Sequence, residues 1–146
     1  HRLRRAGYRL QMNQEIQVKH FFNFSFSKSM GNAFRKSMCW TMYSLKNRDL
    51  FQSSGTASVE LKLNVFFYFL SIILVFYYIW AVPFLFAANL YINRDLIRAF
   101  HETRGALFTL GAVFYYTLLY PLAVGAGGLA GAIKYLWSIK LRGRYK

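Results

Sequence analysis

Residues 63–93 read LNVFFYFLSIILVFYYIWAVPFLFAANLYIN, a run of 31 residues without a charged side chain. A second charge-free run of 28 residues, ALFTLGAVFYYTLLYPLAVGAGGLAGAI, follows at 106–133. A straight helix needs about 20 apolar residues to cross the hydrocarbon core of a bilayer. Both runs exceed that length, so we predict an integral membrane protein with transmembrane helices over 59–93 and 106–133.

The basic residues flank these two runs, and the chain carries a net charge of +14. Residues 1–62 hold 11 Lys and Arg against three acidic residues, a net +8. Residues 94–104 hold three Arg against two acidic residues, a net +1, and the tail 134–146 holds five basic residues and no acidic one, a net +5. Because basic segments stay in the cytoplasm, we predict a multi-pass topology whose N-terminal zone and C-tail are both cytoplasmic, with 94–105 on the opposite side. Three crossings would export the tail, which the same bias disfavours.

Proline and aromatic residues mark the far end of the first run. Pro83 is expected to break or kink the helix, because proline lacks a backbone N–H and clashes with the preceding turn. Tyr77, Tyr78 and Trp80 fit the aromatic belt at a membrane interface. The alternative is a hairpin of two short spans, although each half would have only about 15 residues, which is short for a crossing.

Glycine and proline also punctuate the second run. Gly105 is expected to close a short interfacial helix over 94–105, and Pro121 is expected to kink the helix that follows. Ala123, Gly127 and Gly131 recur every four residues and form a ridge of small residues. Such a ridge allows another helix to approach closely, so we predict a helix–helix contact here and possible self-association.

Residues 24–58 are predicted to be an amphipathic interfacial segment and linker. Apolar side chains recur at helical spacing, at Phe26, Met30, Ala33, Phe34, Met38, Met42 and Leu45. Lys28, Arg35, Lys36 and Trp40 are the residues expected to contact the membrane surface. A helix whose apolar face packs on a protein core is the alternative.

Several functional classes are disfavoured by what the sequence lacks. Neither apolar run contains a carboxylate, Lys or His, which an ion pathway or proton relay normally needs. No Cys/His cluster has the spacing of zinc ligands, and no glycine-rich phosphate loop is present. The basic residues flank the apolar runs and form no dedicated face, which argues against nucleic-acid binding.

Two stretches resemble membrane-bound family-2 glycosyltransferases. HRLRRAGYRLQMNQEIQVKHF at 1–21 is similar to the "RL-x-x-x-G-Y-R" and "V-x-H" pieces that end the catalytic domain of that family. The matching residues are Arg2, Leu3, Gly7, Tyr8, Arg9, Val18 and His20. NRDLIRAFHETRGALFTLGAVFYYTLLYPLAVGAGG at 93–128 is similar to the "N-R-D-x-x-x-F … R-G-x-x-F-x-x-G" membrane tail of the family. The likeness covers essentially the whole chain.

The resemblance implies a mainly α membrane protein with a short α/β remnant of a GT-A-like catalytic domain over 1–23, an interfacial amphipathic helix and two transmembrane helices. It implies sugar transfer from a nucleotide-sugar donor to a lipid or a membrane-associated glycan. The family's Asp-x-Asp motif, which holds a divalent cation (Mn or Mg), and its Glu-Asp general base would lie upstream of His1. The chain is therefore expected to be a C-terminal part that is inactive alone and holds no catalytic residue.

The resemblance also places three candidate site residues near the donor. His20 lies at the position that approaches the metal or the diphosphate, and Arg2 and Arg5 are candidates for phosphate contacts. A solvent- or headgroup-facing role is the favoured alternative for the arginines. The "Q-x-x-R-W" motif of processive synthases is not clear, so polymer synthesis is not expected. The alternative function is a small non-enzymatic membrane scaffold that binds partners through the glycine ridge.

Overall fold

The computed structural model describes residues 6–9, 25–50 and 58–143, and within these ranges it is mainly helical and contains no strand. Its elements are α2 (Phe26–Asn47), α3 (Val59–Val75), α4 (Ala81–Ile92), α5 (Arg94–Phe114), the π-helix η1 (Tyr115–Leu119) and α6 (Tyr120–Gly143). The α/β remnant expected over 1–23 lies outside the described residues, except for residues 6–9, where Gly7 has a φ of +81° in a turn.

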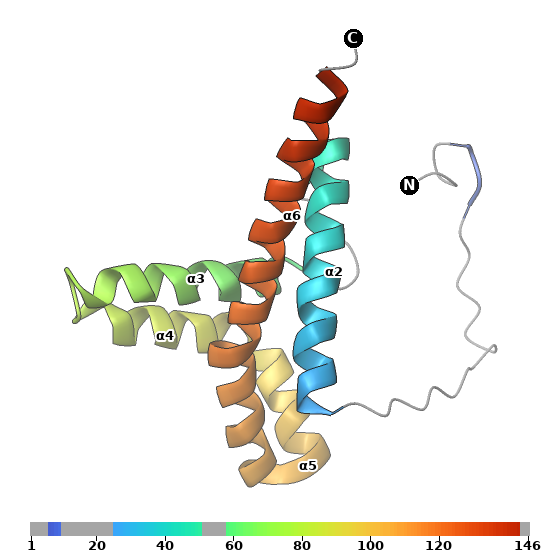
Figure 1. Cartoon of the computed structure of the whole chain (residues 1–146). Helices are drawn as coiled ribbons and strands as arrows, with labels where there is room; N and C mark the ends of the chain where they lie inside the picture. Colours follow the sequence, from blue (N-terminus) through green and yellow to red (C-terminus); the bar gives the residue numbers. More distant parts are fainter. Residues whose placement is uncertain (1–5, 10–24, 51–57, 144–146) are drawn as a thin grey trace.

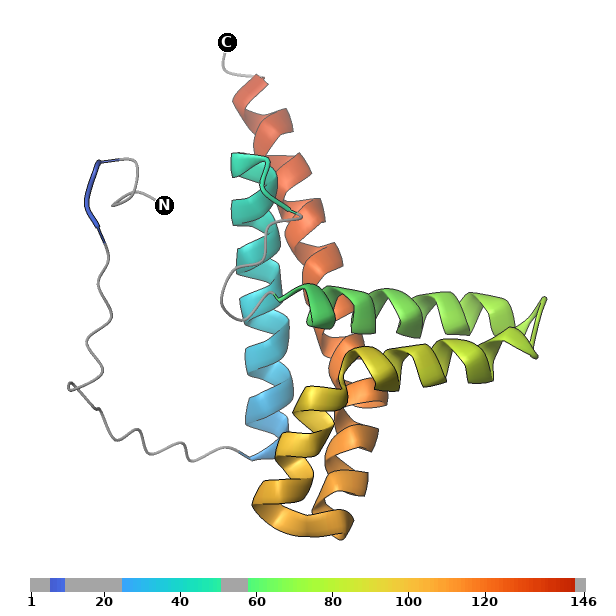
Figure 2. The same ribbon diagram turned by 180° about the vertical axis from the view of Figure 1, so that it is seen from behind.

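Helices α2 and α6 run side by side in the same direction (Figures 1 and 2). The hydroxyl of Ser25 caps the start of α2 by accepting from the backbone N–H of Lys28, and Arg48 ends the helix in the left-handed conformation. Ala33 is buried in α2, and the hydroxyl of Ser37 donates to the carbonyl oxygen of Val124 at 2.7 Å. The predicted amphipathic helix is thus present, and it packs against α6 of the same chain.

The first apolar run forms two helices, α3 and α4, which lie antiparallel and project from the rest of the molecule as a hairpin (Figure 1). The chain turns at residues 76–80, ahead of Pro83, which occupies the first turn of α4, where its missing N–H leaves no helical bond unmade. The structure therefore differs from the single helix expected over 59–93 and has the hairpin that was its alternative. The hairpin is held at its base by packing of α3 on α4 and by buried side-chain amides.

Gly105 interrupts α5 with φ +78° and ψ −176°, so the short helix ends where the sequence predicts. A Cβ at this position would meet no other atom within 4 Å, and the backbone conformation is therefore what requires glycine. Beyond Gly105 the helix continues through η1 into α6. In the described part of the chain, Arg94–Lys140 is the one helical segment long and apolar enough to cross a membrane by length and composition, whereas the sequence predicts two.

The π-helix η1 lies just before Pro121, where the sequence predicts a kink. The backbone N–H of Tyr120 bonds to the carbonyl of Tyr115, five residues back. Pro121 has no N–H to offer to Tyr116 in the same register. The carbonyl oxygen of Tyr116 instead accepts a hydrogen bond from the side-chain amide of Asn64 at 2.8 Å. The irregular backbone thus creates the acceptor that joins α3 to the second apolar run.

Candidate functional site

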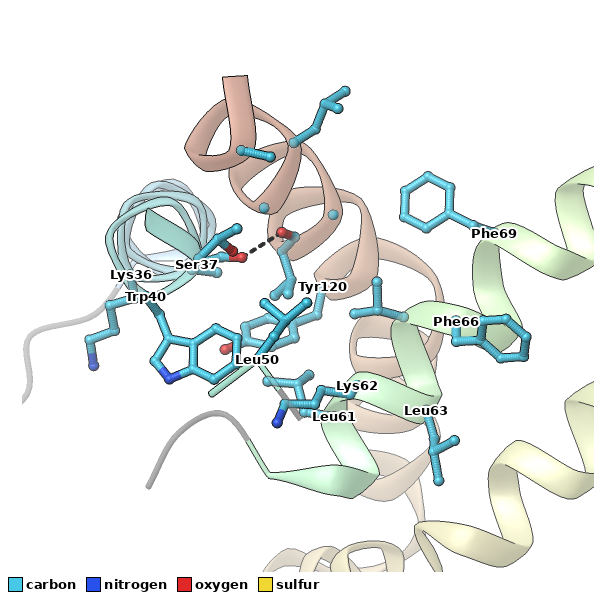
Figure 3. A pocket seen from close by; sticks show the side chains of 18 of the residues that line it. Lys36, Ser37, Trp40, Leu50, Leu61, Lys62, Leu63, Phe66, Phe69 and Tyr120 are labelled. Carbon is cyan, nitrogen blue, oxygen red and sulfur yellow. Dashed lines mark hydrogen bonds between the residues drawn. The ribbon is translucent and has the colours of Figure 1, made fainter. Parts of the chain in front are cut away.

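A groove of about 1040 Å³ lies where α2, α3 and α6 meet (Figure 3). Its walls are mostly apolar and come from helices that are distant in sequence. They include Ala33, Leu50, Val59, Leu61, Leu63, Val65, Phe66, Phe69, Val124, Leu129 and Ala132. The groove can therefore accommodate an elongated apolar ligand.

Two lysines and a tryptophan form the polar rim of this groove. Lys36 and Trp40 come from α2, and Lys62 comes from the start of α3, just before the charge-free run. The Lys62 ammonium nitrogen lies 4.8 Å from the centroid of the Trp40 ring, and Figure 3 shows that ring between the two lysine side chains in this view. Burial lowers the pKa of Lys62, and the nearby Asp49 carboxylate opposes that shift. A bound anion would act in the same direction as Asp49 and favour the charged ammonium.

Two glycines of α6 keep the groove open. A Cβ on Gly125 would collide with the ring of Phe69. A Cβ on Gly128 would lie 3.6 Å from both the Ser37 and the Thr41 hydroxyl oxygens, which is an ordinary contact. Residues with side chains larger than methyl at Gly128 would therefore project into the space between α2 and α6.

A cluster of buried amides lies at the base of the hairpin. Asn64, Asn89 and Asn93 are at most 3% exposed. Their side chains form a continuous set of hydrogen bonds, from Asn93 to Asn89, from Asn89 to Asn64 and from Asn64 to the Tyr116 carbonyl. Sequence analysis missed this cluster, although asparagines in an otherwise apolar run are the signal that could have revealed it.

The residues predicted for the site fall into three groups. Lys36 and Trp40 line the groove, whereas Lys28 and Arg35 are exposed on α2 and do not. Ala123, Gly127 and Gly131 are buried, and Cβ atoms on Gly127 and Gly131 would collide with the backbone of Phe34 and Met38 in α2. His20, Arg2 and Arg5 lie outside the described residues.

The chemistry available at the groove is that of binding. Its lining contains no Asp, Glu, His or Cys. Among the residues that the structure describes, no group of three or more His, Cys, Asp or Glu side chains could hold a metal ion. The described residues therefore offer no donor set for the divalent cation that the resemblance implies.

Comparison with known proteins identifies no relationship for this chain. No protein-family model matches it, and neither does any curated protein or any solved structure.

Proposed function

We propose that this chain is the C-terminal membrane part of a family-2-like glycosyltransferase, which transfers a sugar from a nucleotide-sugar donor to a lipid or a membrane-associated glycan. In this proposal the groove holds the apolar part of a lipid acceptor. Lys36 and Lys62 face its anionic headgroup. The observation that carries the proposal is an apolar groove whose rim presents two lysines beside a tryptophan.

The two parts of the groove would contribute different things to binding. Burying a lipid chain contributes about 0.8 kcal/mol for each CH₂ group, so the apolar walls supply most of the affinity. A lysine near an anionic headgroup contributes about 1 kcal/mol, which is enough to orient the lipid at the rim. The groove volume of about 1040 Å³ is in the range of sites that hold small molecules.

The proposal leaves the bond-making groups outside this chain. The divalent cation, Mn or Mg, and the general base belong to motifs that the resemblance places upstream, so we propose that the chain alone transfers no sugar. His20 remains a prediction for the metal or diphosphate contact, and Arg2 and Arg5 remain predictions for phosphate contacts.

We also propose that the protein is integral to the membrane and multi-pass, with the N-terminal zone and the C-tail on the cytoplasmic side. The net charges of +8 on 1–62 and +5 on 134–146 support this orientation. The alternative, a scaffold that binds partners through the glycine ridge, gains no support from the structure. Gly127 and Gly131 already lie against α2, so a partner helix would have to displace it.

Lipid binding can be measured through the fluorescence of Trp40. Replacing Trp80 and Trp137 by Phe leaves Trp40 as the single tryptophan, since the chain has three. The protein in detergent is titrated with hexadecyl phosphate and, separately, with hexadecanol. We expect tighter binding of the phosphate. Lys36→Gln and Lys62→Gln should each weaken that binding about fivefold, because one lysine contributes about 1 kcal/mol.

Arg35→Gln is the matched control, because Arg35 neighbours Lys36 on α2 and does not line the groove. It should leave binding unchanged. Equal affinity for the alcohol and the phosphate, or equal losses from all three substitutions, would contradict the assignment of the lysine rim.

A further inference from the structure

The α3–α4 hairpin projects from α6 on the side away from α2, and both views agree on this placement (Figures 1 and 2). Its outer surface is apolar, with exposed side chains at Phe66, Ile72, Ile73, Val75, Phe84 and Phe86. The turn at its tip is more exposed still, and Trp80 is 85% exposed. An apolar surface of this extent needs a covering partner.

The charges next to the hairpin identify that partner. No charged residue occurs between Lys62 and Arg94, which stand at the two ends of the hairpin base. The amides of Asn64 and Asn89 are buried and bonded to each other, so they present no polar group outward. An apolar body with basic residues at its base and Tyr77, Tyr78 and Trp80 at its tip matches a lipid bilayer with anionic headgroups.

The position of α2 is unfavourable for a crossing by α6. Ser37 bonds to the carbonyl of Val124, so Arg35 and Lys36 of α2 lie level with the middle of the charge-free run 106–133. If α6 crossed the bilayer, these exposed basic residues would be carried to the depth of the hydrocarbon core, where charges are strongly disfavoured.

The surface of α6 suggests a different placement for this helix. Exposed apolar side chains recur at three-, four- and seven-residue spacing, at Leu118, Leu122, Leu129, Ile133 and Leu136. By helical periodicity they form a stripe on the side away from Ala123, Gly127 and Gly131, which pack toward α2. The stripe therefore faces the direction in which the hairpin projects.

We infer that α3 and α4 are the segments that enter the bilayer, tip first, and that both ends of the hairpin remain on the same membrane face. Helix α6 lies along that face with its leucine stripe toward lipid, and α2 covers it on the aqueous side. The 17 residues of α3 measure about 25 Å. Together with the turn at 76–80, they reach the far side of a hydrocarbon core about 30 Å thick.

This path goes beyond the proposed function and changes one predicted position. It keeps the N-terminal zone and the tail on one side, and it adds the connector 94–105 to that side. The basic residues of all three segments then share one face. The groove lies at the foot of the hairpin, level with the headgroups.

Cysteine labelling tests this path in cells that express the protein. Cys39→Ser removes the one native cysteine. Thr103→Cys, Ser138→Cys and Ile79→Cys are then added singly and treated with a membrane-impermeant maleimide, in intact cells and in inverted vesicles. We expect positions 103 and 138 to react only in inverted vesicles, and position 79 to react only from outside intact cells.

Each other outcome contradicts the inferred path in a different way. Reaction of position 103 from outside would favour two crossings by 63–93 and 106–133. Reaction of position 138 from outside would show that α6 crosses. A cysteine at 103 or 138 that reacts only after detergent is added would lie within lipid, and reaction of position 79 only in inverted vesicles would show that the tip does not enter the bilayer.

Discussion

The side-chain amide of Asn89 in α4 donates a hydrogen bond of 2.7 Å to the side-chain oxygen of Asn64 in α3, and this bond joins the two arms of the hairpin at their base. Asn64 in turn donates to the carbonyl of Tyr116, which the π-helix leaves available. Asn93 donates to both the side-chain and the backbone oxygen of Asn89, each at 2.9 Å. The hairpin, the connector and the second apolar run are thus linked through three buried amides.

Asn64→Leu should destabilise the fold by about 1–3 kcal/mol, because it leaves the Asn89 amide and the Tyr116 carbonyl without partners in a buried site. Thermal unfolding in detergent measures the change. Asn47→Ala is the control, since its amide bonds to the Tyr43 carbonyl at an exposed position, and it should cost no more than about 0.5 kcal/mol. Similar losses from both substitutions would show that the amide cluster has no special role.

Two adjacent glycines of α6 should respond to alanine in opposite directions. Gly127→Ala places a methyl group against the backbone of Phe34 and should cost about 1–3 kcal/mol, because the two helices must separate. Gly128→Ala places its methyl group at 3.6 Å from two hydroxyl oxygens and should be neutral or stabilise by up to about 1 kcal/mol through helix propensity. Differential scanning of both variants compares them directly. Equal effects would mean that α2 does not approach α6 as closely as described.

Local signals in the sequence predict several of these features. The helical spacing of Ala33, Phe34 and Met38 predicts the face by which α2 packs, and the run of small residues predicts a close helix contact. Gly105 predicts the end of the connector helix, because its positive φ suits glycine. Each of these features depends on residues that are close in sequence.

Features that depend on distant residues could not be predicted in this way. The hairpin turn occurs at 76–80 because α3 and α4 pack on each other and share the Asn64–Asn89 bond, whereas Pro83 alone suggests a break further along. The groove combines Lys36 with Lys62, which reach the same rim only because α2 and α3 both pack on α6. Hydrophobicity alone does not distinguish one long span from two shorter helices.

His20 provides a prediction for the complete enzyme, and it rests on the resemblance. His20→Ala should lower turnover by roughly ten- to a hundredfold and leave membrane insertion intact, a size typical of losing one supporting contact to a metal. Arg142→Ala in the tail should change little, because one flanking charge contributes about 1 kcal/mol at the membrane surface. Turnover is measured with and without added manganese or magnesium, and full activity of the His20 variant would remove this assignment.

Sugar transfer from a nucleotide-sugar pool to membrane lipid is the most direct test of the proposed function. It is measured in membranes that contain the complete enzyme, as wild type, Gly128→Ala and Gly128→Leu. The wild type and the alanine variant should transfer sugar at similar rates. The leucine variant should lose most activity, because its side chain projects between α2 and α6 into the groove. Full transfer by the leucine variant would contradict the lipid groove, and the absence of transfer by the wild type would contradict the glycosyltransferase function itself.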